Sequence, residues 1–276
     1  ALALPLEPPD ARCAYGPHPA QFGDLYLPDG PGPHPVAILL HGGCWRDAVD
    51  LTYCSEAARD LARHGLAAWS LEYRRLGGGG GWPETFLDAG AGADFVRDLA
   101  EDYPLDLSRV VALGHSAGGH LALWLAARQA VPRESELYAS DPVPLAGVVA
   151  LAGIPDLAEA ARLELCRGAV LDLMGGGPAE RPERYRDGSP AERLAPGLEQ
   201  TFSHGVQDEI VPAECVRLYA AFAKQRGDAL NGDAVQLDIL PETGHFDIIS
   251  PRRPQWQHVR SRVQRAASGK RKEGTR

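Results

Sequence analysis

Two apolar runs that do not alternate with polar residues constrain the fold of this chain most strongly. Residues 35–41 read Pro-Val-Ala-Ile-Leu-Leu-His, and residues 145–154 form the longest apolar run of the sequence. Successive side chains of a strand point to opposite faces, so an unbroken apolar run indicates a strand that is buried on both sides. Strands of this kind are typical of parallel sheets covered by helices on both faces.

Segments with strand character alternate with segments of helical spacing along the chain. This order predicts an α/β fold with a mostly parallel central sheet of about eight strands and helices on both faces. Active sites in such sheets lie at the carboxyl ends of the strands. We expect strands at 21–27 (an edge strand), 35–41, 66–73, 109–114, 145–154, near 201 and at 235–240, and helices at 54–64, 84–102, 117–129, 213–226 and 255–267.

The length of 276 residues fits one large domain, and no internal repeat or long linker divides the chain. We therefore expect a single domain over residues 1–276. The stretch 155–196 is rich in Leu, Ala, Arg and Gly and is expected to form a small cap over the site. Residues 268–276 carry clustered charges without apolar periodicity and are expected to be a disordered tail.

The strongest motif is Gly114-His-Ser-Ala-Gly118, which follows an apolar strand and opens a predicted helix. In this context a G-x-S-x-G pattern indicates a sharp turn that lifts Ser116 above the sheet, and small neighbours let the strand and helix approach closely. The alternative is an ordinary Gly/Ser turn before a helix.

A serine nucleophile needs a base and a carboxylate that orients the base, and in this type of sheet they follow the serine in the order acid, then His. His245 lies in a loop directly after the predicted strand 235–240, whereas His258 lies within the last predicted helix. Asp208 follows a short predicted strand and precedes a helix that opens at Pro212. Glu209 is the local rival of Asp208, which could also be a simple turn or capping residue.

Acyl transfer also requires N–H donors for the oxyanion, and Ala117, next to the nucleophile, supplies the first. The second is expected from Gly43 or Cys44, in the segment His41-Gly-Gly-Cys-Trp45 that follows a buried strand. Taken alone, this segment would be a common turn. The residues expected to contact the substrate are Gly42, Trp45, Trp82 and His115, although core packing is an equally good interpretation of the two tryptophans.

With His41-Gly-Gly-Cys-Trp45, Gly114-His-Ser-Ala-Gly-Gly-His-Leu-Ala122, Gly205-x-x-Asp208 and Gly244-His245 in order, the sequence resembles the α/β-hydrolase superfamily over nearly its whole length. Within it, the chain is similar to the esterase/lipase branch that includes bacterial feruloyl-esterase-like proteins and kynurenine formamidases. The resemblance implies a Ser116-Asp208-His245 triad, an acyl-enzyme intermediate and no cofactor or metal. Position 44 departs from the formamidases, which usually carry an aromatic residue there.

The resemblance implies a serine hydrolase that cleaves a small carboxylic ester. One alternative is a kynurenine formamidase-like amide hydrolase, which would use the same triad. Another is a catalytically inactive ligand-binding module on the same scaffold. The oligomeric state stays open, a homodimer included.

Charge and cysteine content limit the expected partners and compartment. The net charge of −9 and the pI near 5.5 argue against nucleic acid as a partner. No apolar run approaches the roughly 20 residues that span a bilayer. The odd number of scattered cysteines predicts free thiols in a reducing cytoplasm, with Cys44 as a small packing residue.

Overall fold

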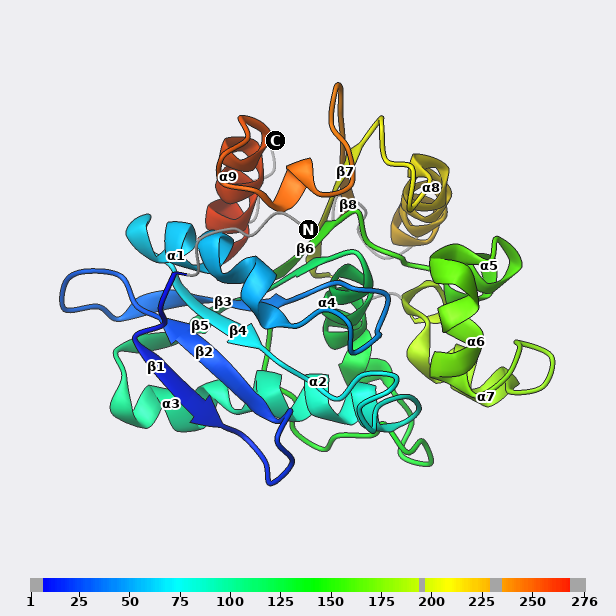
Figure 1. Ribbon diagram of the computed structural model, residues 1–276, viewed down its shortest axis with the longest axis horizontal. Helices are drawn as coiled ribbons and strands as arrows, with labels where there is room; N and C mark the ends of the chain where they lie inside the picture. Colours follow the sequence, from blue (N-terminus) through cyan, green and yellow to red (C-terminus); the bar gives the residue numbers. More distant parts are fainter. Residues whose placement is uncertain (1–6, 194–196, 229–234, 269–276) are drawn as a thin grey trace.

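The computed structural model describes residues 7–193, 197–228 and 235–268. Within these residues an eight-stranded sheet has the strand order β1-β2-β4-β3-β5-β6-β7-β8 (Figure 1). The first two strands join the sheet antiparallel, and all other neighbours are parallel. The strands are β1 Ala11–Ala14, β2 Phe22–Tyr26, β3 His34–Leu40, β4 Ala67–Leu71, β5 Leu105–His115, β6 Gly147–Leu151, β7 Glu199–Gly205 and β8 Val235–Leu240.

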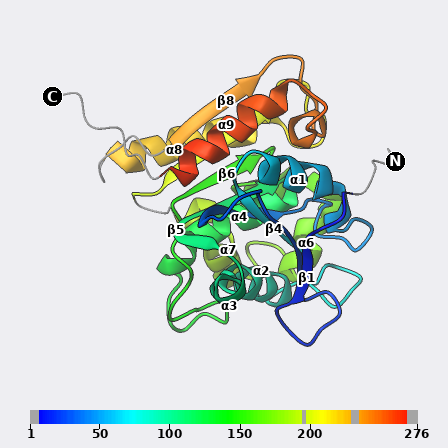
Figure 2. The same cartoon turned by 90° about the vertical axis from the view of Figure 1, so that its left-hand side faces the viewer.

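Helices cover both faces of the sheet, as Figures 1 and 2 show. The buried residues of α1 and α9 belong to one core cluster, and those of α2, α3 and α4 belong to the other. The helices are α1 Ser55–Arg63, α2 Glu84–Asp94, α3 Val96–Asp102, α4 Ala117–Ala127, α5 Leu157–Arg162, α6 Ala169–Met174, α7 Pro182–Gly188, α8 Ala213–Asp228 and α9 Gln255–Ala267. Short 3₁₀ helices are η1 Leu51–Cys54, η2 Arg128–Ala130, η3 Leu165–Gly168, η4 Pro190–Glu192 and η5 Asp247–Ile249.

The central strand β3 explains why an unbroken apolar run is needed at this place. Val36, Ile38 and Leu40 face one core cluster, while Ala37 and Leu39 face the other, and all five are fully buried. Burial on both faces follows from the two helical layers. The expected α/β fold with a mostly parallel sheet is therefore confirmed.

Two expected elements differ from the structure. The segment 21–27 is not an edge strand, because β1 pairs with its outer side. Arg12 of β1 holds the buried Asp24 of β2 through two hydrogen bonds of 2.6 and 2.8 Å, which gives this short strand a polar anchor that apolar periodicity does not reveal. The expected helix 84–102 is divided at Phe95 into α2 and α3.

The segment between β6 and β7 contains α5, η3, α6, α7 and η4, which gather beside the carboxyl end of the sheet (Figure 1). It coincides with the stretch 155–196 that was predicted to form a cap, of which residues 194–196 lie outside the described part. The predicted tail 268–276 also lies outside it, except for Ser268. No helix of the described residues is both long enough and apolar enough to cross a membrane.

Candidate active site

Ser116 forms the sharp turn between β5 and α4. Its φ of 56° and ψ of −120° lie far from the regions that L-residues ordinarily adopt, and such a conformation persists only where its surroundings enforce it. A Cβ on Gly114 would overlap the carbonyl group of Gly118, and a Cβ on Gly118 would overlap the carbonyl oxygen of Leu40. The glycines thus allow the approach of strand and helix that the turn requires.

The backbone N–H groups of Ser116 and Ala117 have different partners. The Ser116 N–H donates to the carbonyl oxygen of Leu151 on β6 at 2.8 Å, which fixes the turn to the sheet. Ala117 is the first residue of α4, and the first N–H groups of a helix have no acceptor within the helix. The Ala117 N–H is therefore suited to bind an oxygen atom of a substrate attached to Ser116.

Asp208 and His245 meet at the carboxyl ends of β7 and β8. The Nδ1 of His245 lies 2.7 Å from Oδ2 of Asp208, and both side chains are at least 95% buried, with 5% and 0% of their surface exposed. Because a carboxylate only accepts hydrogen bonds, the proton of the neutral ring lies on Nδ1. The Nε2 of His245 is thereby left with the lone pair that a base needs.

The two loops that carry Asp208 and His245 are held to each other by backbone contacts. Val206 N–H donates to the carbonyl oxygen of Leu240, and Gln207 N–H donates to that of Thr243, each at 3.0 Å. A Cβ on Gly205 would overlap the Thr243 carbonyl group, so glycine permits this close packing. The spacing between Asp208 and His245 is thus set by the backbone as well as by the hydrogen bond between the two side chains.

Several donors surround the Asp208 carboxylate. Oδ1 accepts hydrogen bonds of 2.9 Å from the backbone N–H groups of Ile210 and Val211, and Oδ2 faces both His245 and the buried His204. Burial alone would raise the pKa of Asp208, but hydrogen bonds from His204, His245 and the Val211 N–H, together with the charge of His245, lower this pKa from its usual value. Asp208 therefore stays ionised at neutral pH.

The loop after β3 passes directly beside Ser116. A Cβ on Gly42 would lie 2.8 Å from the carbonyl oxygen of His115 and 3.0 Å from Cβ of Ser116. The Nδ1 of His41 lies 2.8 Å from the Gly42 carbonyl oxygen, so this oxygen faces the His41 ring. In a trans peptide the N–H points opposite to the C=O, so the Gly43 N–H points away from the His41 ring.

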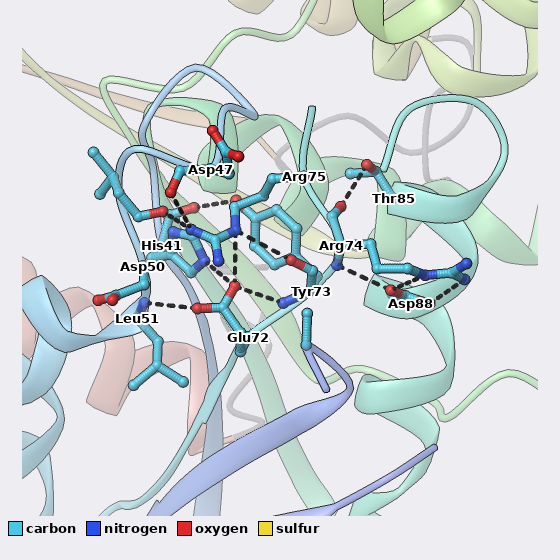
Figure 3. Close-up of polar contacts among 12 residues, drawn as sticks. His41, Asp47, Asp50, Leu51, Glu72, Tyr73, Arg74, Arg75, Thr85 and Asp88 are labelled. Carbon is cyan, nitrogen blue, oxygen red and sulfur yellow. Dashed lines mark hydrogen bonds and ion pairs between the residues drawn. The ribbon is translucent and has the colours of Figure 1, made fainter. Parts of the chain in front are cut away.

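Glu72 anchors this loop from below (Figure 3). Its carboxylate is almost fully buried and accepts from the Nε2 of His41 at 3.0 Å, and Arg75 lies 3.1 Å from the same oxygen. The backbone N–H of Tyr73 donates to this oxygen, Oε1, at 2.9 Å, and the backbone N–H of Leu51 donates to the other oxygen, Oε2, at 3.2 Å. Both ring nitrogens of His41 thus face oxygen atoms, which ties the loop firmly to β4.

The expected substrate contacts engage protein atoms in the structure. His115 and Trp45 are fully buried, and the Trp45 ring packs edge-on against His120. Trp82 is half-buried, packs against Phe86 and donates a 2.9 Å hydrogen bond from Nε1 to Glu136. A substrate role for these side chains and for Gly42 stays a prediction.

The expectation of five free thiols is wrong for two cysteines. Cys44 and Cys166 form a disulfide with a Cα–Cα distance of 5.5 Å, whereas Cys13, Cys54 and Cys215 are free. Cys44 is therefore not merely a packing residue. The sequence does not predict this disulfide because 122 positions separate the two cysteines. The fold brings the loop after β3, which carries Cys44, against η3, which carries Cys166.

Comparison with known proteins places the chain in a family. The sequence pattern of the family described as BD-FAE matches residues 23–221. The chain belongs to the BD-FAE family. The match covers the loop after β3, the Ser116 turn and Asp208, and it ends before His245.

Curated relatives of this family member carry esterase names. The chain is 27% identical over 250 residues to esterase LipC of Mycobacterium tuberculosis, covering 86% of this chain and 60% of LipC. It is 31% identical over 109 residues to an isoprenylcysteine alpha-carbonyl methylesterase of Arabidopsis thaliana, covering 39% of this chain and 25% of that protein. The chain thus spans less than two thirds of the length of either relative.

Solved structures of esterases share the fold. A truncated carbohydrate esterase from gut microbiota superposes with a TM-score of 0.75 at 19% identity, over 95% of this chain and all of that one. Esterase 2 of Thermogutta terrifontis, with propionate bound, gives a TM-score of 0.72 at 18% identity over 92% of both chains. These likenesses confirm the α/β-hydrolase fold.

Three polar residues of the site were not predicted from the sequence: Tyr53, Glu72 and His204. Glu72 and His204 lie on or directly after strands and read as ordinary polar positions. Tyr53 lies in η1, outside any motif. A polar residue at the carboxyl end of a buried parallel strand is a signal that could have identified Glu72 and His204.

Proposed function

We propose that the protein is a serine hydrolase that cleaves a small carboxylic ester through a Ser116-Asp208-His245 triad. The observation that carries the proposal is the 2.7 Å hydrogen bond between Asp208 and His245, two residues at the carboxyl ends of β7 and β8. It fixes the tautomer in which His245 can accept the Ser116 proton. The conformation of Ser116 at the tip of the turn supports its role as the nucleophile.

In the proposed reaction, His245 Nε2 takes the proton from the Ser116 hydroxyl as its oxygen attacks the acyl carbon. Asp208 stabilises the imidazolium that forms. The proton then passes to the leaving alcohol, and the C–O bond of the ester breaks to give an acyl-enzyme. Water, deprotonated by His245, attacks this intermediate and releases the acid.

The oxyanion is proposed to bind the N–H groups of Ala117 and Gly43. The Gly42 N–H already donates to the Tyr53 hydroxyl at 2.8 Å. The Gly42 carbonyl oxygen faces the His41 ring, so the Gly43 N–H points away from that ring. Cys44 is the alternative donor, one residue further along the same loop.

The segment between β6 and β7 is proposed to act as the cap that selects the substrate. Its Cys166 is bonded to Cys44 of the loop after β3 (residues 41–45, here called the oxyanion loop). Its Gly188 carbonyl oxygen accepts a 2.9 Å hydrogen bond from His120 of α4. The segment is thus tied to the two elements that flank Ser116. The esterase names of LipC and of the methylesterase support an ester as the substrate class.

The test combines labelling with turnover. A fluorophosphonate probe is expected to label the wild-type protein and to leave Ser116→Ala unlabelled, with hydrolysis of p-nitrophenyl acetate reduced at least 10³-fold. Ser108→Ala is the matched control, because Ser108 is an exposed serine near the opposite end of the same strand. Wild-type rates in Ser116→Ala would refute the proposal, and absence of labelling and turnover in the wild type would favour an inactive ligand-binding module.

Ester and formamide substrates are separated by a direct comparison. The proposed esterase hydrolyses short p-nitrophenyl esters with a higher kcat/KM than N-formylkynurenine. The reverse order would identify a kynurenine formamidase-like amide hydrolase that uses the same three residues. The loss of both activities in Ser116→Ala would show that one site serves them.

A cytoplasmic location stays a prediction, and the disulfide removes its main support. It was inferred from free thiols, but Cys44 and Cys166 are bonded to each other. Disulfides persist chiefly in oxidising compartments. Alkylation of source cells lysed directly in denaturant without reductant tests the prediction, because five modified cysteines would support a reducing cytoplasm and three would support an oxidising compartment.

A further inference from the structure

A chain of three hydrogen bonds connects the oxyanion loop to the loop of the catalytic histidine. The Gly42 N–H lies 2.8 Å from the Tyr53 hydroxyl oxygen, which lies 2.7 Å from Nδ1 of His115. The Nε2 of His115 in turn lies 2.8 Å from the carbonyl oxygen of His245. Tyr53 and His115 therefore bridge two loops that follow different strands, β3 and β8.

Every hydrogen in this chain has a determined position. A carbonyl oxygen only accepts, so the ring proton of His115 lies on Nε2 and points at His245. Burial, with a further contribution from the nearby His245, lowers the pKa of His115 to about 3, so the ring carries one proton only. Its Nδ1 must then accept from the Tyr53 hydroxyl, and the Tyr53 oxygen accepts from Gly42.

The chemistry of the tyrosine agrees with this direction. Burial raises the pKa of Tyr53 well above its ordinary value, so the hydroxyl keeps its proton and donates it to His115. The neutral state of His115 also suits its position. Its ring lies 4.6 Å from that of His245, where a second positive charge would oppose formation of the catalytic imidazolium.

We propose that Tyr53 and His115 are positioning residues that hold the oxyanion loop and the catalytic base at a fixed separation on either side of Ser116. The proposal rests on the proposed function. It assigns His115, the variable residue of the Gly-x-Ser-x-Gly turn, to the support of the site instead of to substrate contact. Tyr53 acts through the backbone N–H of Gly42, and His115 acts through the backbone carbonyl group of His245.

The first test replaces one hydroxyl group. Tyr53→Phe leaves both the Gly42 N–H and Nδ1 of His115 without their partner, so the loop loses its alignment in the transition state. We expect kcat for p-nitrophenyl acetate to fall about 10- to 100-fold with KM within twofold. The inhibition constant of a phenylboronic acid that adds to Ser116 should rise by a similar factor.

Tyr219→Phe is the matched control. Tyr219 is buried, whereas Tyr53 is half-buried, and the Tyr219 hydroxyl donates one hydrogen bond of 3.2 Å to Gln200, on the part of β7 remote from the Asp208 loop. This variant should keep kcat and inhibitor binding within twofold of wild type. Equal kcat in the two variants would overturn the proposal.

The second test is independent of catalysis. In ¹⁵N spectra of histidine-labelled wild-type protein, His115 should be neutral with its proton on Nε2 from pH 5 to pH 8. A proton on Nδ1, or an imidazolium at pH 6, would overturn the proposal even if Tyr53→Phe failed to fold. Turnover that survives in Ser116→Ala would instead refute the proposed function, and the tautomer would still report on the hydrogen-bond chain.

Discussion

The carboxylate of Asp208 lies 3.3 Å from the Nε2 of His204, a fully buried ring near the end of β7. The same Nε2 lies 2.8 Å from the carbonyl oxygen of Val211, so its single N–H is shared by two oxygen atoms. Asp208 is thus oriented from the strand below as well as from His245. This arrangement distinguishes it from Glu209, which is exposed.

Replacing Asp208 by Asn tests which carboxylate is the acid. The amide removes the charge that holds His245 in the productive tautomer, and kcat should fall by about 10³- to 10⁴-fold. Steady-state kinetics on a p-nitrophenyl ester measure the effect. Glu209→Gln is the control and should stay within twofold of wild type, so a comparable loss in that variant would contradict the assignment of Asp208.

Replacing Glu72 by Gln tests the support of the oxyanion loop. The variant leaves His41 and Arg75 facing a neutral group in a buried site, which should lower the free energy of unfolding by about 3–5 kcal/mol. Because His41 holds the Gly42 carbonyl group, kcat should also fall about tenfold. Urea unfolding and ester turnover measure the two effects.

Asp88→Asn provides the control for Glu72→Gln. Asp88 is equally buried and is held by Arg74 and Gln21, on the other side of the same cluster in Figure 3. We expect a comparable loss of stability with kcat within twofold of wild type. If turnover fell equally in both variants, general loosening of the cluster would explain the effect and no special role would remain for Glu72.

The disulfide predicts a defined thiol count. Alkylation of the denatured, non-reduced protein should modify three cysteines, and five should react after reduction. Cys166→Ser should lower the free energy of unfolding by about 3–5 kcal/mol, because the bond closes a long loop. Cys13→Ser, which alters a free and half-buried thiol, should change the free energy of unfolding far less. Five reactive thiols before reduction would show that the bond does not form.

Buried histidines predict a loss of stability in acid. Burial lowers the pKa of His120 from 6.5 to about 4, so below pH 6.5 the unfolded chain binds a proton that the folded chain excludes. The free energy of unfolding is therefore unaffected by this residue at neutral pH and decreases as the pH falls from 6.5 toward 4. At pH 5, His120 lowers the free energy of unfolding by about 2 kcal/mol.

His120→Gln tests this dependence while retaining a donor for the Gly188 carbonyl oxygen. The difference in unfolding free energy between pH 7 and pH 5 should shrink by about 2 kcal/mol in this variant. His18→Gln, a change of an exposed histidine, is the control and should leave the difference unchanged. An undiminished pH effect in His120→Gln would show that another group is responsible.

Apolar patterning predicted most of the fold because burial on both faces leaves a clear trace in the sequence. Strand β8 and helix α9 begin and end where the pattern indicated, at 235–240 and 255–267. Strand β1 left no such trace, since its four residues alternate between partly buried and exposed and depend on the ion pair of Arg12 with Asp24. Short edge strands with polar anchors lie beyond the reach of periodicity.

The candidate triad could be chosen from chain order and from the position of each residue after a strand. The residues that position the candidate triad could not be predicted, because their partners are distant in sequence and are ordinary backbone or side-chain groups that belong to no motif. His115 faces a backbone carbonyl 130 positions away, and Glu72 binds a ring 31 positions away. Only the folded sheet, which collects strand ends at one edge, makes these pairs visible.

The bond between Cys44 and Cys166 divides the chain into a closed ring and two free arms. Ser116 lies within the ring, whereas Asp208 and His245 lie on the arm that follows it. A single break of the backbone inside the ring would leave both pieces joined through the disulfide, with Ser116 still attached to the rest of the chain. A break between Cys166 and Asp208 would instead separate Ser116 from Asp208 and His245, because no disulfide spans that part of the described residues.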